Sequence, residues 1–127
     1  MVVIKHNPSD MKSSKVLSYA VQVGDVIFTS GLTPRDPQTG EIVNGGIADQ
    51  AKVTFENLRR VLRSTGANVD DVAKVNVYLT RIADAGVMNE AYLQFFGDHR
   101  PARTTVEVSS LTPGMLIEVE AVVAARR

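Results

Sequence analysis

The stretch "VAKVNVYLT", residues 72–80, alternates apolar and polar side chains from one position to the next. A period of two residues is typical of a β-strand with one buried face and one more polar face. The pattern predicts which side chains share a face: Ala73, Val75, Val77 and Leu79 pointing inward, and Lys74, Asn76, Tyr78 and Thr80 pointing outward. Such a strand needs other elements to cover its apolar face, so the flanking segments indicate the fold class.

The two segments that flank this strand have a helical period. In residues 47–65 the apolar side chains recur at three- and four-residue intervals, and Gly66 is well placed to end a helix in a left-handed conformation. Residues 85–96 predict a second, shorter helix. The expected core positions are Ala51, Phe55, Leu58 and Leu62 in the first helix, and Met88, Ala91, Tyr92 and Phe95 in the second.

Further strands are expected before, between and after the helices. They are a hairpin over residues 16–30, a strand from Arg103, a last strand over residues 116–125, and a further short strand at the N-terminus. Helices that come one at a time between strands predict an α+β fold, in which two helices pack on one face of a mixed sheet. A length of 127 residues fits a single domain over residues 1–127.

The second face of this sheet is expected to be too apolar for open water. Its outward side chains include Tyr78, Val122 and either Phe28 or Ile27. An exposed apolar face of this kind is typical of a subunit interface, so we expect an oligomer.

The composition excludes several classes of function. Fourteen basic and fourteen acidic residues cancel, so we expect neither nucleic acid nor an anionic membrane as a partner. The chain has no cysteine, which excludes disulfides, thiolate zinc sites and a cysteine nucleophile. No apolar run is long enough for a signal peptide or a membrane span, so a cytoplasmic protein is expected.

Two carboxylates in the last strand are candidates for proton transfer. Glu118 and Glu120 are two positions apart and therefore share a strand face, while their neighbours in sequence are apolar. Apolar surroundings raise the pKa of a carboxyl group, which suits proton transfer near neutral pH. The alternative is a structural role, in which both carboxylates pair with Arg103 or a backbone amide, and the strand pattern alone favours it.

Arg103 and Ser30 are candidates for ligand binding. The planar guanidinium of an arginine can hold a carboxylate through two parallel hydrogen bonds. The alternative for Arg103 is a salt bridge to Glu107, Glu118 or Glu120. Ser30, at the end of "VIFTSG", has a hydroxyl that would either donate to a ligand or cap a turn.

These residues lie in segments that together resemble a known family. The segments are "VGDVIFTSG", "DPQTGEIV", "FENLRRVL", "VNVYLT", "MNEAYLQFFG", "PARTTVEV" and "LIEVEAVV", in this order. They are similar to the reactive-intermediate deaminase (Rid) family, also known as the YjgF family. The resemblance implies a chorismate-mutase-like α+β domain that assembles as a homotrimer with clefts between subunits.

The resemblance also implies roles for particular residues. Arg103 would hold the carboxylate of a 2-iminoacid, and Glu118 would position or activate the hydrolytic water. The remaining substrate-binding positions would be Ser30 and Gly31 in the "SG" turn, Asn89 at the start of the second helix, and Thr105.

Two positions depart from the best-known branch of the family. That branch often has a cysteine where this chain has Thr105, and a tyrosine where this chain has Leu17. Tyr19 is expected to point to the opposite face and so not to replace that tyrosine. The change at Leu17 leaves open whether the activity is lowered or redirected to another substrate.

The implied reaction is the hydrolytic deamination of 2-imino or enamine acids to 2-oxoacids and ammonia, with no metal and no organic cofactor. One alternative is a trimer that binds a small carboxylated metabolite, or regulates a partner, without catalysis. Another is a deaminase dedicated to an aminoacrylate-like or aminomuconate-like acid of one pathway.

Overall fold

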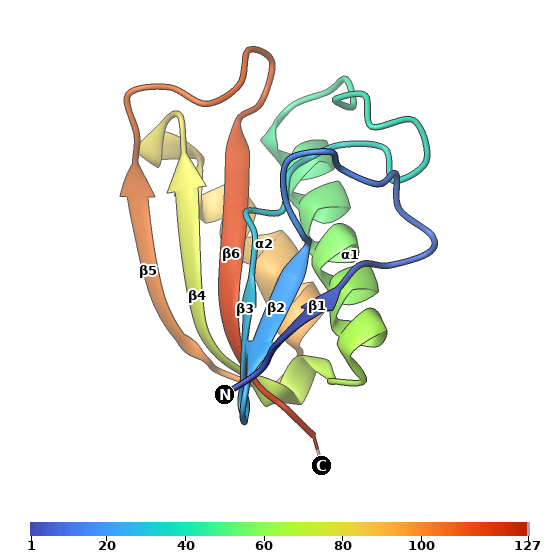
Figure 1. Ribbon diagram of the computed structural model, residues 1–127. Helices are drawn as coiled ribbons and strands as arrows, with labels where there is room; N and C mark the ends of the chain where they lie inside the picture. The colour runs from blue at the N-terminus through green and yellow to red at the C-terminus, as the bar shows by residue number, and fades with distance from the viewer. Residues whose placement is uncertain (127) are drawn as a thin grey trace.

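The computed structural model describes residues 1–126 (Figure 1). Its strands are β1 Val3–His6, β2 Ala20–Val23, β3 Val26–Thr29, β4 Val72–Leu79, β5 Ala102–Glu107 and β6 Ile117–Ala124. Its helices are α1 Ile47–Thr65 and α2 Ala85–Phe96, and two short 3₁₀ turns, η1 Val69–Asp71 and η2 Ile82–Asp84, precede β4 and α2.

The strands form one mixed sheet in the order β1-β2-β3-β6-β4-β5. Strand β5 runs parallel to β4 at one edge of the sheet, while all other neighbours are antiparallel. Both helices cover the same face of the sheet (Figure 1). This arrangement confirms the predicted α+β fold with a mixed sheet and two helices on one face.

The core lies between the helices and this covered face. The bounds of both helices agree with the prediction, and Gly66 ends α1 with a φ of +80°, a conformation that glycine adopts without strain. The ring of Phe55 on α1 packs against three aromatic rings of α2, which belong to Tyr92, Phe95 and Phe96. These four buried rings fix α2 against α1 and thereby set the position of the side chains on the β5 side of α2.

Two expectations about the strands were wrong. Residues 16–19 do not belong to the hairpin, because the Ser14 hydroxyl accepts the backbone N–H groups of Val16 and Leu17 and holds them in a turn. Ala73 is exposed rather than inward, because the register of β4 against β6 shifts between Val72 and Lys74. A bulge of this kind interrupts the two-residue alternation, so Val72 and Val75 both face the core.

The uncovered face of the sheet carries apolar side chains, as expected. Phe28 is 46% exposed and pairs with the half-buried Val122 of β6, whereas Ile27 faces the core. Tyr78 is half-buried on the same face, further along the sheet on β4. Neither α1 nor α2, the helices of the described part of the chain, combines the length and the apolar character needed to cross a membrane.

Candidate active site

Arg103 projects from the edge strand β5 toward the helices. It pairs in register with Val75 of β4, a core residue, so its side chain lies on the helix-covered face. One guanidinium N–H group donates to Oδ1 of Asn89 at 2.7 Å, and the guanidinium carbon lies 4.6 Å from the ring centroid of Tyr92. The ring face attracts the cation and supports the plane of the guanidinium. Two residues of α2 therefore hold Arg103 in place.

The expected alternative for Arg103, a salt bridge within the chain, does not occur among residues 1–126. The ion pairs of this part of the chain involve other arginines, and the nearby carboxylate of Glu107 instead accepts the backbone N–H of Ile82 at 2.9 Å. A guanidinium has five N–H donors, and one of them is used on Asn89. The charge of Arg103 is left without an anionic partner among residues 1–126.

Thr105 lies on the same face as Arg103, two residues further along β5. It pairs with Val77 of β4, and its Oγ1 atom is buried without a hydrogen-bond partner in the described residues. A buried hydroxyl is usually satisfied, so Thr105 is an exception among the described residues. We call Arg103, Asn89, Tyr92 and Thr105 the Arg103 half-site.

Glu118 lies on the other face of the sheet. It pairs with Tyr78 across β4 and β6 and is half-buried against Gly31. A Cβ atom at position 31 would lie 2.7 Å from Cδ of Glu118, so a larger residue there would displace the Glu118 carboxylate. Burial raises the pKa of the Glu118 carboxyl group above its usual value, and the charge of Glu120 adds a smaller contribution. A carboxyl group with a raised pKa holds its proton more tightly than a free one, which is typical of groups that act in proton transfer.

Glu120, the other candidate, is committed to structural hydrogen bonds. Its Oε1 atom accepts the hydroxyl of Tyr78 in a short hydrogen bond, and the side-chain amide of Asn76 at 3.3 Å. The bond to Glu120 is the main reason why the pKa of Tyr78 is raised to about 12, with burial second. Glu118 accepts no such side-chain hydrogen bond among residues 1–126. Of the two carboxylates, Glu118 is therefore the one available for proton transfer.

A cavity of about 460 Å³ opens beside Glu118. Gly31, Leu17 and Tyr19 are among its lining residues, and we call it the Glu118 cavity. The expectation that Tyr19 points to the opposite face was wrong, because residues 16–19 are not in a strand. The Tyr19 hydroxyl is nevertheless occupied, since it donates to the carbonyl of Lys12 at 2.6 Å.

Ser30 uses its hydroxyl within the chain. The hydroxyl donates to the carbonyl of Ser18 at 2.7 Å, and the backbone N–H of Ser30 donates to the carbonyl of Tyr19 at 2.8 Å. These bonds tie the end of β3 to the segment before β2 and so hold Gly31 against Glu118. Toward a ligand, the Ser30 oxygen is left with acceptor capacity only.

The predicted site residues therefore form two groups on opposite faces of the sheet. Arg103, Asn89 and Thr105 meet on the helix-covered face, whereas Glu118 and Gly31 meet on the uncovered face. The sequence analysis placed Tyr92 in the core and missed its contact with Arg103. The available signal was helical spacing, because Tyr92 lies one turn after Asn89, which also contacts Arg103. Residues 1–126 contain no group of three or more histidine or acidic side chains able to hold a metal ion.

The mixed sheet with two helices on one face defines an α+β domain, with Arg103 at the sheet edge and Glu118 on its open face. The chain matches the family described as Endoribonuclease L-PSP over residues 8–125 and belongs to this family, the Rid family. A RutC family protein of Pyrococcus abyssi is 49% identical over 105 residues, which cover 83% of each chain.

Two further relatives carry more specific names. The human 2-iminobutanoate/2-iminopropanoate deaminase is 39% identical over 105 residues, which cover 83% of this chain and 77% of the human protein. The crystal structure of Escherichia coli TdcF with bound serine has a TM-score of 0.88 and 31% identity, covering 97% of this chain and 99% of that one.

Proposed function

We propose that the protein hydrolyses 2-imino or enamine acids to 2-oxoacids and ammonia. The observation that carries the proposal is Arg103, a positioned guanidinium that forms no ion pair within the described part of the chain. The deaminase name of the human relative and the amino acid bound to TdcF support a small carboxylated substrate.

Arg103 would bind the substrate carboxylate through two parallel hydrogen bonds. Asn89 and Tyr92 hold the guanidinium in one orientation before a ligand arrives, so little side-chain entropy is lost on binding. Thr105, on the same face two residues further along β5, would line the same end of the substrate. A carboxylate fixed in this way also fixes the adjacent imino carbon, which is the atom that water attacks.

Glu118 would handle the protons of the reaction. Its carboxylate takes a proton from water as the water oxygen bonds to the imino carbon, and the C=N double bond becomes a single bond. That proton passes to nitrogen and gives a carbinolamine, which carries a hydroxyl and an amino group on the same carbon. Glu118 then takes the proton of this hydroxyl and delivers it to the amino nitrogen, so that the C–N bond breaks, ammonia leaves and the carbonyl of the 2-oxoacid forms. Iminoacid and water thus give 2-oxoacid and ammonia, and Glu118 is regenerated.

Because Arg103 and Glu118 lie on opposite faces of one sheet, we propose that each site is formed between two subunits. The Arg103 half-site of one subunit would face the Glu118 cavity of its neighbour, in a homotrimer with a cleft at each interface. The apolar side chains on the uncovered face, such as Phe28, would be covered in this assembly.

The direct test is hydrolysis of iminoacids generated in the assay by an amino-acid oxidase. The protein is expected to accelerate release of 2-oxoacid and ammonia over the spontaneous rate, with saturation in the iminoacid. Binding of a 2-oxoacid without any acceleration would instead show a non-catalytic carboxylate-binding protein. If the protein neither accelerates the hydrolysis nor binds a 2-oxoacid, both functions are excluded.

The family description also contains the word endoribonuclease. Fourteen basic and fourteen acidic residues give the chain no net positive charge to attract a polyanion. We therefore do not propose RNA as a substrate.

A further inference from the structure

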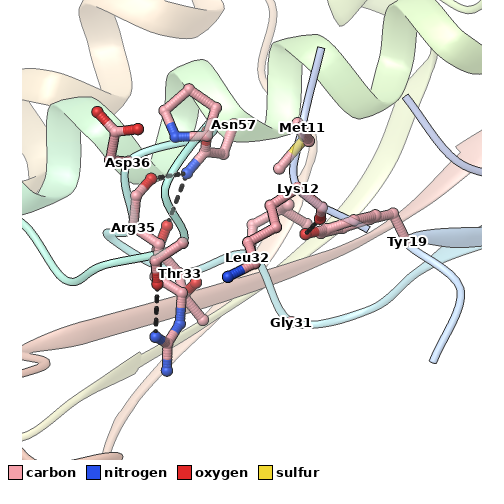
Figure 2. Close-up of a pocket in the computed structure, with 11 residues that line it drawn as sticks. Met11, Lys12, Tyr19, Gly31, Leu32, Thr33, Arg35, Asp36 and Asn57 are labelled. Carbon is pink, nitrogen blue, oxygen red and sulfur yellow. Dashed lines mark hydrogen bonds between the residues drawn. The ribbon is translucent and has the colours of Figure 1, made fainter. Parts of the chain in front are cut away.

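Two cations line the Glu118 cavity together with Glu118 itself. They are Lys12, from the segment between β1 and β2, and Arg35, from the loop between β3 and α1. A smaller recess adjoins the cavity and is lined by the same two side chains (Figure 2). The reaction proposed above uses neither of them.

Arg35 is held from two sides. Its backbone carbonyl accepts a hydrogen bond of 2.9 Å from the side-chain amide of Asn57, a buried residue of α1. Its guanidinium donates to the carbonyl of Gly40 at 2.8 Å (Figure 2). This bond uses one of five donors, so the rest of the guanidinium remains available to a ligand.

Lys12 is fixed by its backbone and by the shape of the loop. Its N–H donates to the carbonyl of Pro37 at 2.6 Å, and its carbonyl accepts the Tyr19 hydroxyl. Its stem passes over Gly40, where an added Cβ atom would lie 3.0 Å from Cδ of Lys12. The ammonium group makes a single long contact, 3.4 Å to the carbonyl of Thr39, and so has donors to spare.

The charges of these two side chains are not neutralised within the described chain. Neither Lys12 nor Arg35 takes part in an ion pair there. Asp36, the nearest acid in sequence to Arg35, accepts the backbone N–H groups of Gln38 and Thr39, and the cation that helps to lower its pKa is Arg60. Glu118 is in the same cavity, but the pKa of its carboxyl group is raised and no cation counteracts this.

We propose that Lys12 and Arg35 bind a second carboxylate on the substrate, so that the preferred substrates are iminoacids with an acidic side chain. The inference rests on the proposed function, in which Arg103 of a neighbouring subunit holds the first carboxylate. If Glu118 were the only charged group in the cavity, it would repel a dianionic substrate. The positive charges of Lys12 and Arg35 in the same cavity offset this repulsion. The cavity volume of about 460 Å³ accommodates a small dicarboxylic acid.

The test compares two 2-oxoacids of equal chain length, 2-oxoglutarate and 2-oxopentanoate, by isothermal titration calorimetry. We expect 2-oxoglutarate to bind at least about tenfold more tightly, because a charge-assisted pair contributes about that factor. Lys12→Met and Arg35→Met should each remove most of this preference and leave the affinity for 2-oxopentanoate within about twofold. Lys15→Met is the matched control, since Lys15 is exposed and does not line the cavity.

Turnover is measured in parallel with 2-iminoglutarate and 2-iminopentanoate, both generated in the assay. Equal binding of the two 2-oxoacids, or a preference that survives both substitutions, would overturn the inference even where both iminoacids are hydrolysed. A preference for 2-oxoglutarate that depends on Lys12 and Arg35, without hydrolysis of either iminoacid, would support the second carboxylate site and contradict the deaminase proposal. The two proposals therefore fail in different measurements.

Discussion

Arg103 and Glu118 lie on opposite faces of the same sheet, separated by strand β4. Arg103 points to the helices and is held by Asn89, whereas Glu118 points to the uncovered face and is packed against Gly31. No rotamer change brings two side chains through a sheet. A reaction that uses both residues therefore needs two copies of the chain.

The first prediction concerns this assembly. Sedimentation equilibrium should give a mass about three times the 13.8 kDa of the chain at micromolar concentration. The physical reason is the uncovered sheet face, where Phe28 is 46% exposed in the single chain. A stable monomer under these conditions would remove the second wall of the proposed site.

Arg103→Lys tests the carboxylate-binding role. Lysine keeps the charge but loses the planar pair of donors, so 2-oxoacid affinity and iminoacid hydrolysis should both fall about ten- to a hundredfold. Thermal unfolding should stay close to that of the parent, because Arg103 is exposed and makes no ion pair among residues 1–126.

The matched control is Arg63→Lys, at an exposed position on α1. It should change neither affinity nor stability. An Arg103→Lys variant that is stable and fully active would show that Arg103 does not hold the substrate, and early unfolding would assign it to the fold.

Glu118→Gln should change the pH dependence of stability. The pKa of Glu118 is raised in the folded state, so the folded state binds this proton more tightly than the unfolded state. Stability from the protonated form is thus fully present below the unfolded pKa and is lost as the pH rises through the raised folded value. The free energy of unfolding of the variant, relative to the parent, should increase with pH across that window.

This comparison is made by chemical denaturation at one fixed protein concentration, because the stability of an oligomer depends on concentration. Glu90→Gln, at an exposed carboxylate of α2, controls for the loss of one negative charge. The desolvation of Glu118 would be contradicted if the free energy of unfolding of Glu118→Gln, relative to that of the parent, fell with rising pH.

Gly31→Ala should lower activity without unfolding the protein. The added methyl group would overlap the Glu118 carboxylate and force it to move, while the backbone conformation at position 31 suits any residue. A loss of kcat of at least about tenfold is expected, since proton transfer by a positioned group contributes about a hundredfold or more. Gly86→Ala is the control, because a Cβ atom there meets nothing within 4 Å. Unchanged kcat in Gly31→Ala would argue against a role for the Glu118 position.

The sequence was sufficient to predict the elements that repeat a simple pattern. The first and last residues of both helices were predicted correctly, because apolar residues recur on one face of each helix and Gly66 ends the first helix in a left-handed conformation. The bulge at Ala73 was missed, because its cause is the register against β6 and not a local preference. The irregular conformation of residues 16–19 was missed because their apolar side chains are typical of a strand. The deciding interaction is the Ser14 hydroxyl, which accepts the backbone N–H groups of Val16 and Leu17.

The division of the site between two faces was not predictable from the strand patterns. Alternation shows which residues of one strand share a face, but in β5 the more polar face, with Arg103, Thr105 and Glu107, is the one that meets the helices. A rule that turns apolar residues toward the core would therefore have chosen the wrong face. The pairing of Arg103 with Val75 settles this point, and it depends on the parallel register of β5 beside β4. For the same reason the contact between Tyr92 and Arg103 could not be read from helical spacing.

The central claim is that Arg103 and Glu118 act together only across a subunit interface. It is tested most directly by unfolding two variants, Arg103→Met and Glu118→Gln, each expected to be inactive alone, and refolding them as an equal mixture. In mixed trimers some interfaces combine an intact Arg103 from one subunit with an intact Glu118 from its neighbour, and we predict recovery of about a quarter of the parent activity. If the mixture stays as inactive as the separate variants while mass measurements show mixed trimers, the two residues do not act across an interface.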